Sequence, residues 1–189
     1  MKKNLFRLLA LCLGCLLLAG CQQGSQNKEL ALDQLQNEEG SYVYSGLSYG
    51  QDQGAVAKAL GIALDAPTIT TPMFDDETME SQEYESYTLP EDEAFTYQDS
   101  PVYATLDFLD DSFTSVQLTF PLEDGEDATA LYEKLSETLQ GHYGAPAVDT
   151  VIETTGASVL QWTSADQESS LQLFTVPDTS VMLIVGELQ

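Results

Sequence analysis

The stretch PVYATLDFLDDSFTSVQLTF, residues 101–120, indicates the fold more clearly than any other part of the chain. Over residues 102–109, apolar side chains alternate with polar ones or Tyr, and residues 113–120 repeat the period of two. This alternation is typical of strands that bury one face. Asp110-Asp111-Ser112 between them is typical of a tight turn. The stretch therefore predicts an antiparallel hairpin, with Thr114, Val116, Leu118 and Phe120 sharing one face of its second strand.

Further strands are predicted on both sides of this hairpin, near residues 82–89, 94–98, 148–153, 157–164, 169–176 and 181–187. Residues 181–185 (VMLIV) are apolar at every position. Such a run predicts a central strand that is covered on both faces. Trp162 shares a face with Leu160 in a predicted strand. We therefore expect Trp162, the only Trp of the chain, to pack in the core.

Two helices are predicted, over residues 52–60 and 126–140. Asp52 is the expected N-cap of the first, and Gly61 is its expected stop. The second has apolar residues at i, i+3 and i+4, which places Leu131 and Leu135 toward the sheet, and Gly141 and Gly144 are its candidate stops. The predicted fold class is therefore α+β, an antiparallel sheet with two main helices on one side.

An internal repeat is predicted from the order of these elements. Each helix is followed by Gly and Ala-Pro, at Gly61 with Ala66-Pro67 and at Gly144 with Ala145-Pro146, and then by about four strands. Two tandem helix-plus-four-strand halves of this kind resemble the secreted protein inhibitors of β-lactamase. Residues 46–61 also resemble the opening of small bacterial lipoproteins, including the small lipoprotein of the β-barrel assembly machine. These resemblances imply a fold and identify no functional residue.

The N-terminus has the features of a targeting segment. Residues 1–7 (MKKNLFR) are cationic, residues 8–18 are apolar apart from Gly14, and Leu18-Ala19-Gly20-Cys21 follows. This order resembles the bacterial lipoprotein signal. The resemblance implies cleavage between Gly20 and Cys21 and a diacylglycerol and palmitate-type anchor on Cys21. It predicts a lipid-anchored protein on the extracytoplasmic face of the cell membrane, or on the outer membrane of a cell that has one.

Three parts of the chain are expected from this signal and from the patterns beyond it. Residues 1–20 form the signal peptide, 21–40 the lipidated Cys and a polar tether, and 41–189 a single α+β domain. The tether is expected because residues 22–40 are polar apart from Leu30, Leu32 and Leu35. After cleavage the chain has no free thiol, which excludes disulfides and Cys nucleophiles.

The charge of the chain excludes several classes of partner. Residues 22–189 contain three Lys, no Arg and all 31 acidic residues, so three positive charges against 31 negative ones leave a formal charge of −28. Nucleic-acid binding is excluded, because it depends on Lys and Arg neutralising phosphates. Contact of the domain with anionic lipid is disfavoured for the same reason.

Candidate catalytic residues are few. Residues 46–50 (GLSYG) fit the nucleophile-elbow pattern G-x-S-x-G, but an α/β-hydrolase needs several parallel strands before its Ser, and too few residues separate Ser48 from Cys21. His142 is the only His and follows a predicted helix end, where it interacts with the helix dipole. We therefore predict no catalytic residue, while a hydrolase that uses carboxylates or Ser48 stays open as an alternative.

The acidic segments suggest cation binding but match no calcium motif. They lie at residues 75–77, 91–93, 110–111 and 123–127. Ca²⁺ takes roughly six to eight oxygen ligands in a shaped loop, and an EF-hand centred on Gly125 would need Asp where Phe120 stands. No metal site and no cofactor is predicted. Weak divalent-cation binding, or a purely structural role in the envelope, stays open as a second alternative.

The nine Tyr residues suggest a protein-binding surface. Tyr and other aromatic residues are enriched in interfaces. We expect one of two sets to line an exposed strand face that binds a partner, either Tyr84, Tyr87 and Tyr97 or Tyr42, Tyr44 and Tyr49. The favoured function is a non-enzymatic binding or accessory module of the bacterial cell envelope. We expect a monomer that contacts the membrane only through the lipid on Cys21 and binds a protein partner.

Overall fold

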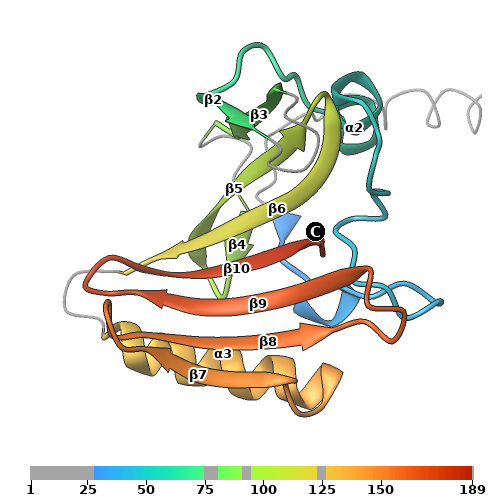
Figure 1. The fold of residues 1–189 in the computed structure, drawn as a ribbon. Coiled ribbons are helices and arrows are strands. Elements are labelled where there is room, and N and C mark those ends of the chain that lie inside the picture. The colour runs from blue at the N-terminus through green and yellow to red at the C-terminus, as the bar shows by residue number, and fades with distance from the viewer. Residues whose placement is uncertain (1–27, 75–80, 91–94, 123–126, 189) are drawn as a thin grey trace, which may run out of the picture.

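The structure is a computed structural model that describes residues 28–74, 81–90, 95–122 and 127–188 (Figure 1). Its main part is an antiparallel sheet with two α-helices, so the α+β class is confirmed, with the sheet dominant. The helices are α2 (Gln53–Leu60) and α3 (Ala128–Tyr143), and a short 3-10 helix, η1, covers Leu32–Gln34. The strands are β1 (Lys28–Glu29), β2 (Ile69–Phe74), β3 (Ser81–Thr88), β4 (Phe95–Tyr97), β5 (Ser100–Leu109), β6 (Ser112–Pro121), β7 (Val148–Ile152), β8 (Ala157–Thr163), β9 (Ser169–Val176) and β10 (Ser180–Glu187).

The sheet runs in the order β2-β3-β5-β6-β10-β9-β8-β7, and all of these neighbours are antiparallel. β4 pairs with β5 at Ser100–Val102, beyond the part of β5 that pairs with β3. β1 is parallel to β4. Every strand predicted from the sequence is present. β2 was missed, because Pro72 interrupts the strand pattern, and such a Pro is tolerated only on an edge strand like this one.

The hairpin of residues 101–120 is confirmed as β5 and β6. Its turn has two central residues, Asp110 and Asp111, with φ of 48° and 63°, as in the turns that match the twist of two strands. The register shifts at Asp107/Phe108, so Phe113 joins Phe108 on the buried face, with ring centroids 5.7 Å apart. Thr114, which was expected on that face, is the extra residue of this β-bulge and has no paired residue in β5. Its hydroxyl donates to the Asp107 carbonyl at 3.2 Å.

Both helices form where the sequence indicates. The Asp52 carboxylate accepts the Ala55 N–H at 2.8 Å at the start of α2, and Gly61 ends this helix with φ of 70°. α3 starts after its N-cap Asp127 and continues to Tyr143, so of the two candidate stops Gly144 is confirmed and Gly141 is wrong. The last turn is held because the Tyr143 hydroxyl donates to the Leu32 carbonyl at 2.6 Å and accepts the Leu35 N–H at 2.9 Å.

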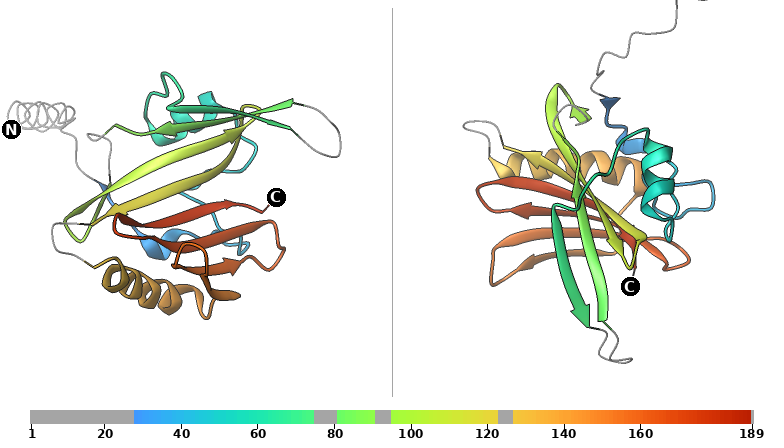
Figure 2. Two further views of the ribbon diagram at one scale, coloured as in Figure 1. Left: turned by 60° about the vertical axis from the view of Figure 1, so that its left-hand side comes forward. Right: turned by 90° about the horizontal axis from the view of Figure 1, so that it is seen from above.

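One face of the sheet forms the core under the helices. Registered neighbours form two fully buried rows across five strands, Leu106–Val116–Val185–Leu171–Trp162 and Ala104–Leu118–Leu183–Leu173–Leu160. Val56 of α2 and Leu135 and Leu139 of α3 belong to the same buried cluster, with Leu131 packed against it. Both helices lie on this side of the sheet (Figure 2). The core positions predicted for Trp162, Leu131 and Leu135 are confirmed.

The segment expected to be a tether is folded from residue 28 onward. Leu30, Leu32 and Leu35 are 6%, 4% and 2% exposed and belong to the core. η1 packs against α3, and β1 pairs with β4. The boundary at residue 41 is therefore wrong for residues 28–40. No helix in the described part of the chain is long and apolar enough to span a membrane.

Candidate functional site: the open face of the sheet

The side of the sheet opposite α2 and α3, which we call the open face, carries no helix in the described part of the chain (Figure 2). Strand residues alternate between the two faces, so the register fixes the members of each face. Two rows cross the middle of the open face: Thr105–Gln117–Ile184–Gln172–Gln161–Val148 and Tyr103–Thr119–Met182–Phe174–Val159–Thr150.

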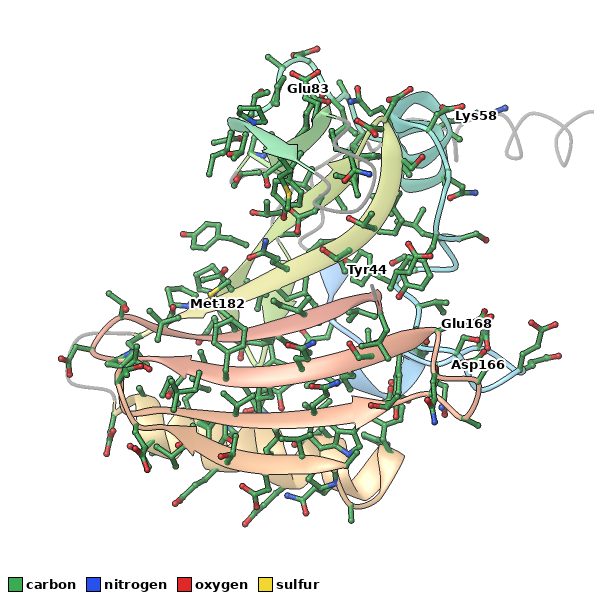
Figure 3. All side chains as sticks on the ribbon, viewed as in Figure 1. Tyr44, Lys58, Glu83, Asp166, Glu168 and Met182 are labelled. Carbon is green, nitrogen blue, oxygen red and sulfur yellow. The ribbon has the colours of Figure 1, made fainter. Side chains whose placement is uncertain are left out.

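The side chains of β10 show that this face is uncovered. Leu183 is fully buried on the helix side, whereas its neighbours Met182 and Ile184 are only partly buried. Figure 3 views the sheet from this face, with Met182 in front and α3 behind the strands. The expectation that residues 181–185 are covered on both faces is therefore wrong, although β10 is central. A sheet with helices on one side only leaves alternate residues of such a strand open to solvent.

Apolar side chains extend the open face to both edges of the sheet. Ile69 and Met73 of β2 are 57% and 44% exposed, and Val148 and Ile152 of β7 are 41% and 44% exposed. The register places all four on the open face, while Val151 lies on the other. Four of the five large exposed apolar side chains that the described residues include thus share one face. The exposed apolar side chains of the described residues are thus concentrated on this face, at its two edges, as expected for a surface that binds a partner.

The open face carries almost no charge. Of the Asp, Glu and Lys residues in the described strands of this sheet, the register places only Asp107 on it. Glu83 and Glu85 of β3, Asp149 of β7 and Glu187 of β10 all point to the helix side. Glu85, for example, accepts a hydrogen bond from the Gln53 amide of α2 at 2.6 Å.

Asp107 is fully buried and its carboxylate is bound by neutral donors. Oδ1 accepts the Ser86 hydroxyl at 2.6 Å, and Oδ2 accepts the Ser115 hydroxyl at 2.7 Å and the Gln117 amide at 2.8 Å. Burial, together with the Asp107 charge, raises the pKa of the neighbouring Tyr84 hydroxyl to about 12. The cluster links β3, β5 and β6 through side chains on the open face. Its role is to hold these strands in register, because each donor would otherwise be left unpaired.

A close approach of two strands shapes one end of the open face, at the last residues of β10. Ser115 of β6 and Gly186 of β10 are registered neighbours, and a Cβ on Gly186 would lie 2.9 Å from the Ser115 Cβ. Small residues continue this row from Ser86 through Asp107, Ser115 and Gly186 to Ser170. The glycine is required because no other residue leaves room for Ser115.

Acidic residues stand around the open face, at the hairpin turns. Five turns carry them, at Asp99, Asp110 and Asp111, Glu153, Asp166 with Glu168, and Asp178. The labelled Asp166 and Glu168 lie at the end of the sheet, far along the strands from Met182 (Figure 3). The Ser164 hydroxyl and the Glu168 N–H donate to Asp166, and they lower the pKa of its carboxyl. We call these turn residues the acidic frame.

The predicted partner face is not assembled. Tyr84 lies on the open face, but Tyr87 is buried and its ring meets Phe108 edge-on at 5.5 Å. Tyr97 packs edge-on against Phe120 at 5.7 Å, which is on the helix side. Residues three apart in a strand point to opposite faces, so Tyr84 and Tyr87 could not share one.

The other set of Tyr residues forms no exposed face either. Tyr42 and Tyr44 are buried in the core, and Tyr49 is partly buried against it.

The candidate catalytic residues are not brought together. Ser48 is exposed in the loop before α2, and the chain between η1 and α2 forms only an isolated bridge, Gln36 to Tyr42, and not the strand that a nucleophile elbow requires. His142 is exposed in the last turn of α3. Three described cavities, of about 410, 330 and 180 Å³, include neither residue in their linings.

Several predicted positions lie outside the described residues. They include Gly20, the lipidation site Cys21 and the acidic segments 75–77, 91–93 and 123–126. The acidic pair 110–111 is described and forms the β5–β6 turn. No group of three or more potential metal ligands is found in the described part of the chain.

Comparison of the chain with protein-family models, with curated proteins and with solved structures finds no match.

Proposed function

We propose that the protein is a lipid-anchored, non-enzymatic binding module on the extracytoplasmic side of a bacterial cell envelope, and that it holds a protein partner on the open face. One observation carries this proposal. A chain with a formal charge of −28 beyond Cys21 leaves one whole sheet face without an exposed carboxylate or ammonium group in its described strands.

The composition of the open face supports a protein partner. The centre of a protein interface is depleted in charged residues and enriched in Met and aromatic residues. Tyr103, Phe174 and Met182 lie in one row of the face, each partly buried, beside a row of Gln and Ile. Such side chains give contact area and hydrogen bonds without the cost of burying an ion.

The position of the N-terminal segment supports presentation away from a membrane. β1 and η1 lie on the helix side of the sheet, where η1 packs on α3 (Figure 2, right). Six residues lie between Cys21 and Lys28, so their Cα atoms can be at most about 25 Å apart. A lipid on Cys21 would then hold the helix side near the bilayer and turn the open face toward the outside.

We also propose that the domain consists of two tandem halves. The strand order supports this, because β2-β3-β5-β6 and β7-β8-β9-β10 are both meanders, each preceded by a helix and joined through their last strands, β6 and β10. A chain split between residues 124 and 125 is expected to reassemble from its two pieces. Pieces that fail to associate when refolded together would contradict the two-half organisation.

The anchor is tested at Cys21. A Cys21→Ser precursor is expected to stay uncleaved and to incorporate no labelled palmitate, while the unchanged chain incorporates it. Labelled lipid on the Cys21→Ser protein would contradict the lipid-anchor part of the proposal.

The binding face is tested by site-specific photocrosslinking in the cells that make the protein. A benzophenone side chain at Met182 reports contacts of the open face, and the same group at His142 is the control on the helix side. We expect a discrete adduct with another protein from position 182 only. No adduct from position 182, or the same adduct from both positions, would overturn the open face as the binding surface.

A further inference from the structure

Seven acidic residues of the described chain stand at turns that border the open face, and no exposed acidic side chain of the described strands lies on that face. The acidic frame holds seven carboxylates at five hairpin turns, at both ends of the strands. On the face itself, the single carboxylate of the described strands, Asp107, is buried under its own donors. The surface therefore has a neutral, partly apolar centre and a negative border.

Within the described part of the chain, no lysine stands in the strands of the open face or in the five turns of the frame. Lys28 is in β1, Lys58 is in α2 and Lys134 is in α3, and these elements lie on the helix side (Figure 2). The Lys58 label marks α2, away from the strands that carry Met182 (Figure 3). A one-sign border of this kind produces a directed field in front of the face, which attracts a body of opposite charge and repels one of like charge.

A second copy of the chain does not fit this surface. Two open faces packed together would bring two acidic frames into contact, and each copy carries −28 beyond Cys21. Like charges placed opposite each other across an interface oppose association. The charge pattern thus selects a partner of a different chemistry.

We infer that the partner is a cationic protein whose contact surface has an uncharged apolar centre bordered by Lys and Arg. This inference rests on the proposed function and adds the chemistry of the partner. The neutral centre supplies the buried contact area, and the frame accelerates encounter, because complementary border charges act mainly on the association rate. The complex should therefore form more slowly when the frame is neutralised or screened by salt.

Two double variants distinguish the effect of the acidic frame on association from the effect of the protein's net charge. Asp111→Asn with Asp178→Asn removes two charges from the frame, at turn positions with φ of 63° and 61°, which Asn tolerates. Glu133→Gln with Glu137→Gln removes two charges from exposed positions of α3. The net charge of the protein changes equally in both pairs.

The test uses the full-length chain with the benzophenone group at Met182 in washed envelopes, with the adduct identified by mass spectrometry. We expect a partner of net positive charge. In 0.02 M NaCl, the double variant Asp111→Asn with Asp178→Asn should lower the initial rate of adduct formation about threefold or more. The double variant Glu133→Gln with Glu137→Gln should leave that rate nearly unchanged. In 0.5 M NaCl, the difference between the two pairs should disappear.

The outcomes distinguish this inference from the proposed function. No adduct from position 182 overturns both. A discrete adduct with an acidic or neutral protein, or with a second copy of the chain, overturns the inference and keeps the open face as a binding surface. An equal loss of rate in the two pairs also overturns the inference, because net charge alone would then explain the effect.

Discussion

The two faces of the same strands differ in what they bury. On the helix side, Leu183 contacts the core and is fully buried, while Ile184, the next residue of β10, is partly exposed on the open face. Both residues are large and apolar, and they differ in that α2 and α3 cover the helix side of the sheet but not the open face. An apolar residue on the helix side is explained by stability, whereas an apolar residue on the open face needs another explanation, and partner binding supplies one.

The largest difference between the faces is expected in stability. Leu183→Ala should lower the free energy of unfolding by about 2–5 kcal/mol, because it leaves a cavity in a close-packed core. Ile184→Ala, which removes a similar side chain one residue further on, should cost under about 1 kcal/mol. Urea unfolding followed by circular dichroism measures both. Equal losses would show that the open face is covered.

A second prediction concerns the polar cluster of the open face. Asp107→Ala should lower the free energy of unfolding by about 1–3 kcal/mol, because the buried Ser86 hydroxyl and the partly buried donors of Ser115 and Gln117 lose their acceptor. Asp111→Asn, at an exposed turn position whose φ of 63° Asn tolerates, should change it by no more than about 0.5 kcal/mol. If the two variants unfold at the same urea concentration, the cluster does not hold β3, β5 and β6 together.

The smallest expected effect comes from the acidic frame and the other surface carboxylates. Self-repulsion weakens a compact state of such high charge, and salt screens it. The chain from residue 28 should therefore have a higher Tm in 0.5 M NaCl than in 0.02 M NaCl. Added Ca²⁺ at about 1 mM should raise Tm no more than NaCl of equal ionic strength, because no described loop has a calcium pattern. A calcium-specific rise of many degrees would instead favour the cation-binding alternative.

The sequence predicted the strands and helices well, because their signals are local. The period of two in β5 and β6 and the caps at Asp52 and Gly61 are all set within a few residues. The folded N-terminal segment escaped prediction because its support is long-range. Leu35, for example, donates its N–H to Tyr143, 108 residues away.

The candidate site could be predicted only in part. The apolar run 181–185 was visible, but periodicity within a strand does not tell how many layers cover a sheet. The Tyr residues were grouped by type and spacing, although pleating sends Tyr84 and Tyr87 to opposite sides. The acidic frame could not be predicted, because it depends on which turns lie at the ends of the same sheet. That is known only once the strand order is known.

The central claim, that the open face and not the helix side binds the partner, is tested most directly by one matched pair of substitutions. Gln172 lies partly buried in the middle of the open face, and Gln140 is exposed on α3. Gln172→Lys places an unpaired cation at the centre of the proposed interface, and Gln140→Lys adds the same charge elsewhere. The adduct yield from the benzophenone group at Met182 should fall about tenfold or more with Gln172→Lys, since burying an unpaired ion costs several kcal/mol, and should stay unchanged with Gln140→Lys. An unchanged yield with Gln172→Lys in a folded protein, or an equal loss with both variants, would contradict the claim.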